Sequence, residues 1–187
     1  MYISLGGNCS IGWQLAQYNL RSESYPFDWV KIKINQLINI LENNFNDYVE
    51  SLQIKKYSQA HESYILTNSY SVQFAHEFIK DNDLNNLKNK LINRINRFCN
   101  LPNEHIIFLR IELEPIKSNY IEKINKLVQL LGKYTTNFII KIILESKSYD
   151  QIKDNLIPQI QFIKYDSFSS DWKMNHVCWK EILSLNS

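Results

Sequence analysis

The segment that decides the fold lies at residues 105–113 and reads His-Ile-Ile-Phe-Leu-Arg-Ile-Glu-Leu. Residues 106–109 within it form a short, continuous apolar run. A similar run, Asn-Phe-Ile-Ile-Lys-Ile-Ile-Leu, occupies residues 137–144. Such runs are typical of strands that are covered on both faces, as in a parallel sheet. Both segments are therefore expected to be strands of a largely parallel sheet.

Strands and helices are expected to alternate around this pair. Further strand patterns lie at residues 2–5, 63–66, 71–75 and 159–165. Amphipathic patterns predict helices at residues 10–20, 32–45, 83–101, 119–134 and 177–185. Gly132 falls near the end of one of them, where a terminating glycine is expected. Together these patterns predict a single domain over residues 1–187, an α/β layered fold with a mostly parallel central sheet and helices on both faces.

The composition excludes several classes of partner. The formal net charge is only +2 and acidic residues are mixed among the basic ones, so we expect no nucleic-acid partner. No apolar run reaches the roughly 18 residues of a transmembrane helix, and the N-terminus lacks the pattern of a signal peptide. These observations predict a cytoplasmic protein without a membrane partner.

The cysteines indicate reduced thiols rather than disulfides or zinc ligands. Cys9, Cys99 and Cys178 are odd in number and widely spaced, which fits neither a disulfide framework nor a zinc pattern. The histidines are scattered, without the H-x-x-x-H pair of many metal sites. No metal and no cofactor are therefore expected, and the thiols are expected in a reducing compartment.

Cys9 is a candidate nucleophile because it follows Gly6-Gly7-Asn8 and precedes a predicted helix. The first turn of a helix has unpaired N–H groups and a partial positive charge, which favour a thiolate over a thiol. The alternative, of equal weight, is a small buried residue that fills space beside the sheet. Ser10 is a rival nucleophile, but we favour it as the helix N-cap.

The two glycines permit a sharp turn and a close approach of a ligand to the backbone. The turn lacks the pattern of a dinucleotide-binding or phosphate-binding glycine loop, so a tight connection between strand and helix is the simpler interpretation. If the turn binds substrate, the candidate residues are Gly7, Asn8 and Ser10. Backbone N–H groups around Ser10 would then stabilise an oxyanion.

Asp28 and His76 complete the residue types of a thiol–imidazole–carboxylate site. Asp28 stands between Phe27 and Trp29, so it is expected to be partly buried and either paired or protonated. It is a candidate to orient a histidine, or else a turn or helix cap. His76 ends an apolar strand and is the candidate acid or base, or else a histidine at the edge of the core.

His176 is the alternative imidazole. It follows Asp171 and precedes the last predicted helix. In serine hydrolases of the flavodoxin-like type, an Asp and a His near the C-terminus serve a nucleophile that follows the first strand. The order of Cys9 or Ser10, Asp171 and His176 resembles that order. Its spacing from Asp171 differs from their usual D-x-x-H pattern, so this signal is weak.

Arg94 and Arg110 are candidates to bind an anionic part of the substrate. Arg94 lies three residues before Arg97 on a predicted helix, and Arg110 interrupts an apolar strand. A guanidinium binds a carboxylate or phosphate in bidentate fashion. The alternative, which we favour slightly, is internal pairing with acids such as Asp28 or Glu112.

Several motifs, taken in order, resemble those of one known family. Residues 4–9, Ser-Leu-Gly-Gly-Asn-Cys, and residues 24–29, Ser-Tyr-Pro-Phe-Asp-Trp, are similar to the start of the family described as "putative papain-like cysteine peptidase", an uncharacterised group of viral and bacterial proteins. Residues 74–78 resemble its F-x-H-D-F element, with Glu77 in place of Asp. Residues 93–98 resemble its R-R-x-x-R-F helix, with Asn93 in place of the first Arg. With the strand that ends in Arg110, the resemblance extends from residue 1 to about residue 113.

The resemblance implies a nucleophile at Cys9 and a base at His76, with Asp28 as the third member. A papain-like fold pairs a helical lobe with an antiparallel sheet, whereas the alternation of strand and helix after residue 80 predicts an α/β scaffold. The expected site lies at the C-terminal ends of the strands, beside residues 6–10.

The leading hypothesis is a thiol-dependent hydrolase or acyl transferase with an anionic substrate. One alternative is an α/β enzyme that processes a glycan or a phosphorylated ligand without covalent catalysis, with the glycine turn and Arg110 as its anion site. The other alternative is a non-enzymatic binding domain.

Overall fold

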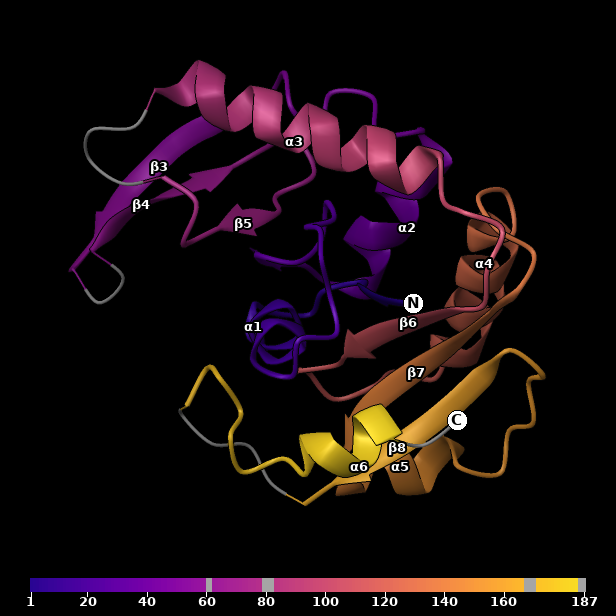
Figure 1. The fold of residues 1–187 in the computed structure, drawn as a ribbon. Helices are drawn as coiled ribbons and strands as arrows, with labels where there is room; N and C mark the ends of the chain where they lie inside the picture. Colours follow the sequence, from indigo (N-terminus) through magenta and orange to yellow (C-terminus); the bar gives the residue numbers. More distant parts are fainter. Residues whose placement is uncertain (60–61, 79–82, 167–170, 185–187) are drawn as a thin grey trace.

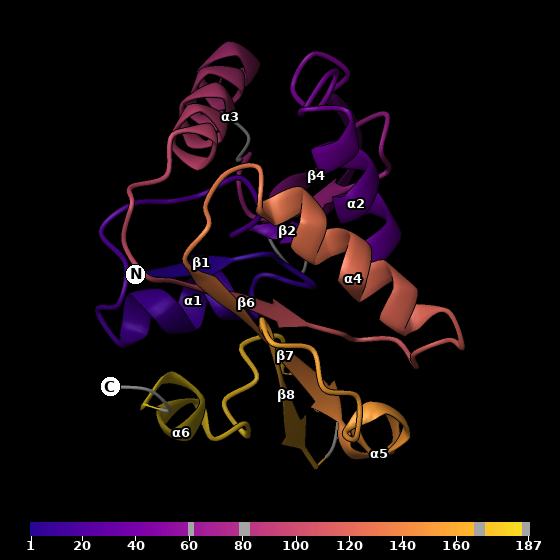
Figure 2. The same ribbon diagram turned by 90° about the vertical axis from the view of Figure 1, so that its right-hand side faces the viewer.

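The computed structural model describes residues 1–59, 62–78, 83–166 and 171–184, and two β-sheets form the framework of these residues. One sheet is parallel, with four strands in the order β1-β6-β7-β8. Figure 1 shows β6, β7 and β8, and Figure 2 also shows β1. The strands of this sheet are β1 (Tyr2–Ser4), β6 (Ile106–Ile111), β7 (Phe138–Glu145) and β8 (Ile160–Tyr165). All four coincide with strands that the sequence predicts, and their pairing confirms the expected parallel sheet.

The other sheet is antiparallel, in the order β2-β5-β4-β3. Its strands are β2 (Val30–Lys31), β3 (Gln53–Ser58), β4 (Ser63–Thr67) and β5 (Gln73–Phe74). β4 and β5 confirm the strand pair that the sequence predicts, whereas β2 and β3 are not predicted. β2 has only two residues, and β3 is exposed along nearly its whole length and so has no apolar face. The chain is thus a mixed α/β protein with a separate antiparallel sheet beside the parallel one.

The helices lie close to their predicted positions. They are α1 (Ser10–Gln17), α2 (Ile34–Glu42), α3 (Leu84–Cys99), α4 (Tyr120–Leu131), α5 (Ser146–Ile152) and α6 (Trp179–Ser184). The sequence does not predict the short α5, and Leu185, the last residue of the final predicted helix, lies outside the described residues. Gly132 follows α4 with a φ of −58°, so it does not use the left-handed conformation of many helix-ending glycines. None of the described helices has the length and apolar character needed to cross a membrane.

Side chains of β6 alternate between two hydrophobic clusters, as the pleat of a strand requires. Ile106 and Phe108 pack with residues of α2, α3, α4 and the antiparallel sheet, whereas Ile107 and Leu109 pack with residues of α1 and α6. Figure 2 shows α4 and α6 on opposite sides of the parallel strands. The antiparallel sheet therefore shares a hydrophobic cluster with one face of the parallel sheet.

The connection from β1 to α1 is a tight glycine turn, as the sequence predicts. Gly6 and Gly7 have φ values of +76° and +111°, a region that favours glycine. The carbonyl of Gly6 accepts from the N–H of Ile111, and that of Gly7 accepts from the N–H of Ile32, both at 3.2 Å. A Cβ at Gly7 would lie 2.0 Å from the carbonyl oxygen of Ile111. The turn is therefore wedged between the end of β6 and the chain after β2, and it places Cys9 at the carboxyl edge of the parallel sheet.

Candidate functional site

Cys9 occupies the N-cap position of α1 and is largely buried, with 7% of its surface exposed. Burial and, to a smaller extent, the negative charge of Glu77 raise the pKa of the Cys9 thiol to about 12. The expectation that the helix N-terminus lowers this pKa is therefore wrong. Loss of hydration and a nearby carboxylate both disfavour the thiolate, and here they outweigh a backbone hydrogen bond that favours it.

Asn8 and Ser10 form a hydrogen-bonded turn around Cys9. The Oδ1 atom of Asn8 accepts from the backbone N–H of Ser10 at 3.0 Å and from the Ser10 hydroxyl. Ser10 is fully buried and is the first residue of α1, so the prediction that it caps the helix is wrong. Its N–H, an expected oxyanion donor, is already bonded to Asn8.

The carboxylate that acts on the Cys9 thiol belongs to Glu77, the residue after His76. Arg94 of α3 donates to both oxygens of Glu77, with Nη1–Oε1 at 2.6 Å and Nη2–Oε2 at 3.3 Å. The two side chains are only 11% and 10% exposed. Arg94 is thus paired internally, as the favoured interpretation of the arginines predicts, but with Glu77 rather than with Asp28 or Glu112.

Asp28 is paired, as the sequence predicts, with a guanidinium, and it is almost completely buried rather than partly buried. Its Oδ2 atom accepts from the backbone N–H of Tyr25 at 2.9 Å and from Arg21 Nη1 at 2.6 Å. Its Oδ1 atom is buried and has no hydrogen-bond partner among the described residues. Burial raises the pKa of Asp28 to about 6, although the Tyr25 N–H and the charges of Arg21 and Arg94 act in the opposite direction.

The segment that carries Asp28 packs directly against α1. A Cβ at Gly12 would lie 2.6 Å from the carbonyl oxygen of Asp28. The preceding residue, Phe27, packs against Phe45 and Phe98, each with ring centroids 5.7 Å from its own. The contact at Gly12 and the aromatic anchor together fix Asp28 beside the first turns of α1.

His76 lies against an aromatic group that reaches α1. Its ring is 5.0 Å from that of Trp172, and Trp172 makes an edge contact with Trp13 of α1 at 6.3 Å. Trp13 is four residues after Cys9, so the two positions are neighbours along one side of the helix. The structure therefore links the predicted imidazole to α1 through two aromatic rings, Trp172 and Trp13.

His176, the alternative imidazole, is exposed, and its ring contacts that of Tyr165 at 6.4 Å between centroids. The segment before it also reaches α1, because Gln14 Nε2 donates to the carbonyl of Lys173 at 2.8 Å. Asp171 accepts from the backbone N–H of Lys173 at 2.9 Å, which stabilises this segment locally.

Arg110 is fully buried and lies away from a ligand's reach. It donates to both oxygens of Glu112, at 2.6 and 3.0 Å, and to the carbonyls of Leu5 and Ile32, at 3.1 and 3.3 Å. The favoured prediction of internal pairing with Glu112 is confirmed. This guanidinium ties β6 to the turn after β1 and to the chain near β2.

Sequence reasoning missed Arg21 as the partner of Asp28 and Glu77 as the charge beside Cys9. Glu77 stands inside the quoted motif at residues 74–78, so that motif is the signal for it, whereas Arg21 lies three residues before the motif at residues 24–29. Trp172 is different, because nothing in the sequence indicates that it approaches Trp13 from so far along the chain.

The groups around the start of α1 are thus a thiol, the carboxylates of Glu77 and Asp28, and the guanidinium partners of these carboxylates, and His76 is linked to α1 through Trp172 and Trp13. A thiol with an imidazole near it suits acyl transfer through a covalent intermediate. Over the described residues, no three His, Cys, Asp or Glu side chains gather as a possible metal site.

Comparison with known proteins agrees with the motif resemblance. Residues 1–148 match the family described as "Putative papain-like cysteine peptidase (DUF1796)". An uncharacterised protein of Acanthamoeba polyphaga mimivirus is 34% identical over 216 aligned positions, which cover 98% of this chain and 96% of the relative. No solved structure matches the chain. With its motifs assembled around Cys9 and most of its length matched, the chain belongs to the "putative papain-like cysteine peptidase" family.

Proposed function

We propose that the chain is a thiol-dependent hydrolase or acyl transferase in which Cys9 is the nucleophile and His76 moves the proton. The observation that carries the proposal is a convergence of separate motifs. Cys9, the Glu77 carboxylate next to His76, and Asp28 come from three motif segments and meet at the start of α1. The description of the family, which names a cysteine peptidase, supports the same chemistry.

The proposed reaction has two steps. In the first, the Cys9 sulfur attacks the acyl carbon while its proton passes to the His76 ring, and the leaving group departs with that proton. In the second, water, or another acceptor in a transferase, attacks the thioester and returns a proton to Cys9 through the same imidazole. Each step moves one proton and exchanges one acyl bond.

The raised pKa of Cys9 makes the base essential in this proposal. With a pKa of about 12, only on the order of one thiol in 10⁵ is ionised at pH 7. The thiol therefore loses its proton during the attack rather than before it. A resting thiol of this kind is also protected from oxidation, which requires the thiolate.

Asp28 and Asn8 have supporting roles in the proposal. Asp28, bonded to Arg21 and Tyr25, positions its segment against α1 instead of orienting the imidazole. In the resting state the side-chain oxygen of Asn8 accepts the hydrogen bond of the Ser10 N–H. Rotation of the Asn8 side chain frees that N–H for the oxyanion.

The test uses p-nitrophenyl acetate as an acyl donor. The expected result is an acetyl group on the Cys9 peptide, detected by mass spectrometry after an acid quench, and its loss in Cys9→Ala. Cys99→Ala and Cys178→Ala are the matched controls, since both thiols are exposed, and they keep the activity. His76→Asn slows acylation by about 10²-fold or more, the usual contribution of a general base.

The dependence of the acylation rate on pH separates the proposed mechanism from simple thiolate reactivity. Attack assisted by His76 stops depending on pH once its imidazole is neutral and able to accept the proton. Attack by a preformed thiolate instead keeps rising toward the pKa of Cys9, about 12. Acetylation that persists in Cys9→Ala, or a rate unaffected by His76→Asn, would overturn the proposal.

A further inference from the structure

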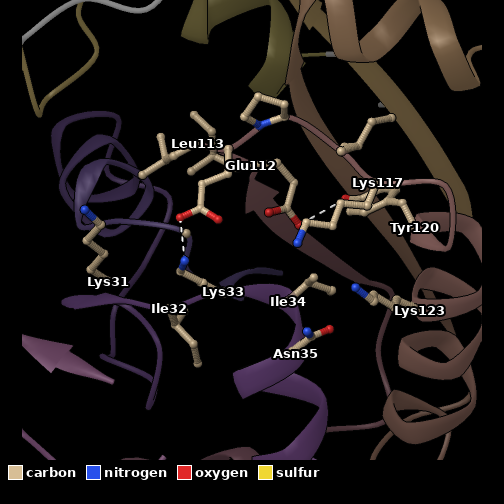
Figure 3. A pocket seen from close by; sticks show the side chains of 15 residues that line it. Lys31, Ile32, Lys33, Ile34, Asn35, Glu112, Leu113, Lys117, Tyr120 and Lys123 are labelled. Carbon is tan, nitrogen blue, oxygen red and sulfur yellow. Dashed lines mark hydrogen bonds and ion pairs between the residues drawn. The ribbon is translucent and has the colours of Figure 1, made fainter. Parts of the chain in front are cut away.

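A pocket of about 330 Å³ lies at the carboxyl edge of the parallel sheet, beside the turn at Gly7. Its walls come from that turn, from the chain that runs from β2 into α2, and from the chain that runs from β6 into α4 (Figure 3). Ligands of open α/β sheets bind at this edge. The volume lies at the lower end of the range for small-molecule sites, so it suits a small ligand rather than a polymer. Cys9 does not line this pocket.

Four lysines line the pocket: Lys31, Lys33, Lys117 and Lys123. Lys33 forms an ion pair with Glu114 at 2.7 Å. In the part of the chain that the structure describes, no carboxylate lies within 4.0 Å of the amino groups of the other three. The pocket therefore has an excess of positive charge.

The remaining acid of the pocket, Glu112, does not cancel this excess. Arg110 donates to both of its oxygens, at 2.6 and 3.0 Å, and the Tyr120 hydroxyl donates to it at 3.0 Å. Its negative charge is thus already matched by a buried guanidinium. The excess charge also acts on Glu114, whose pKa is lowered chiefly by the Lys33 hydrogen bond and further by the charges of Lys31 and Lys117.

Two helices begin at the pocket. Ile34 and Asn35 open α2, Tyr120 opens α4, and all three residues line the cavity. The two helices lie side by side (Figure 2). The N-terminal end of a helix carries a partial positive charge, which attracts anions. The N–H of Lys33 already donates to Gln36 Oε1 at 2.7 Å, and that of Tyr120 donates to the carbonyl of Lys117 at 2.9 Å. The charge of the two helix ends, rather than these two N–H groups, therefore adds to the charge of the lysines.

We propose that this pocket binds a small phosphorylated molecule, with its phosphate held by Lys117 and Lys123 at the start of α4 (Figure 3). A phosphate monoester matches the site because its charge of nearly −2 and its several acceptor oxygens suit two amino groups beside the positively charged ends of two helices. The amide of Asn35 offers a neutral donor or acceptor to the organic part. This inference does not depend on the chemistry proposed for Cys9.

The test measures binding of glucose 6-phosphate, inorganic phosphate and glucose by calorimetry, and maps it by amide chemical shifts. Glucose 6-phosphate is expected to bind, to shift the amides of Asn35 and Tyr120, and to bind more weakly as salt rises. Glucose without phosphate is expected not to bind. The double variant Lys117→Gln/Lys123→Gln is expected to weaken binding by about tenfold or more, because two charge-assisted contacts are lost.

A matched control removes the same net charge elsewhere. Lys133→Gln/Lys164→Gln changes two exposed lysines outside the pocket and is expected to leave the affinity unchanged. Equal weakening in both double variants would show non-specific charge attraction and overturn the proposal. So would binding without shifts at Asn35 and Tyr120, binding of inorganic phosphate alone, or no binding of either phosphate. Cys9→Ala leaves the affinity unchanged in the proposed arrangement.

Discussion

Arg94 holds both carboxylate oxygens of Glu77, at 2.6 and 3.3 Å, and the same carboxylate raises the pKa of the Cys9 thiol. One ion pair thus connects α3, the segment of His76 and the start of α1. The charge of Arg94 also acts on the carboxyl group of Asp28. A change in this pair is therefore transmitted to both ionisable groups beside α1.

Glu77→Gln is expected to lower the pKa of Cys9, because it removes the negative charge that disfavours the thiolate. In the unchanged protein, iodoacetamide at pH 8 is expected to label Cys9 on the order of 10²–10³-fold more slowly than an ordinary thiol of pKa about 8.5. The exposed Cys178 is the internal reference. Peptide mass spectrometry of the labelled chain is expected to show faster Cys9 labelling in Glu77→Gln. An unchanged rate, in a variant with a native circular dichroism spectrum, contradicts the assigned charge effect.

Asp28→Asn is expected to change how stability depends on pH. The pKa of Asp28 is raised to about 6 from its ordinary 3.8, so the folded state binds the proton more tightly than the unfolded state. The stabilisation that the bound proton gives to the folded state is therefore fully present below about pH 4 and is lost as the pH rises to about 6. The loss corresponds to about 3 kcal/mol at most.

The measurement is the free energy of unfolding in urea between pH 4 and pH 7 for both proteins. The difference between the two curves isolates Asp28 from the other carboxylates. A constant difference over this range would be inconsistent with the raised pKa.

Arg110→Met is expected to destabilise the fold by about 3–5 kcal/mol, since it leaves the Glu112 carboxylate buried without its partner. The double variant Arg110→Met/Glu112→Gln is expected to lose less of the free energy of unfolding, because no uncompensated charge remains. Urea denaturation measures both. A single variant within about 1 kcal/mol of the unchanged protein would contradict the structural role of this pair.

Gly7→Ala is expected to prevent stable folding, since the new Cβ would lie 2.0 Å from the Ile111 carbonyl at a φ of +111°. Gly132→Ala is the matched control. Its Cβ would come no nearer than 3.3 Å to another atom, so its effect is expected to stay within about 1 kcal/mol. Soluble expression and thermal melting distinguish the two variants. Equal melting temperatures would contradict the close packing of the turn.

The parallel sheet could be predicted because its strands are buried on both faces. Residues 106–109 are apolar without alternation, as are residues 138–144 except for Lys141, and this pattern is typical of strands covered on both faces. β3 could not be predicted, because an exposed edge strand has no apolar face to reveal it. α5 is too short for its periodicity to rise above chance.

Cys9, Asp28 and His76 could be named as candidates from the sequence, but neither Glu77 and Arg21 nor the electrostatics of the site could be. The argument for a low pKa at Cys9 used the local helix terminus, whereas burial and Glu77 are tertiary effects. Likewise, the motifs include Arg94 and Asp28 but not the partner that each selects in the folded chain. Those partners depend on how α3 packs beside the segment of Glu77 and where the segment of Arg21 lies in the folded chain.

The register of β1 has a consequence for synthesis of the chain on the ribosome. Tyr2 pairs with Ile107, and β1 has β6 as its one neighbour in the parallel sheet. At about 5–20 residues per second, the first strand waits on the order of 5–20 seconds for that neighbour to emerge. A nascent chain that ends before residue 106 therefore contains the candidate residues from Cys9 to Arg94. It lacks β6, the strand that pairs with β1 just before the turn at Cys9.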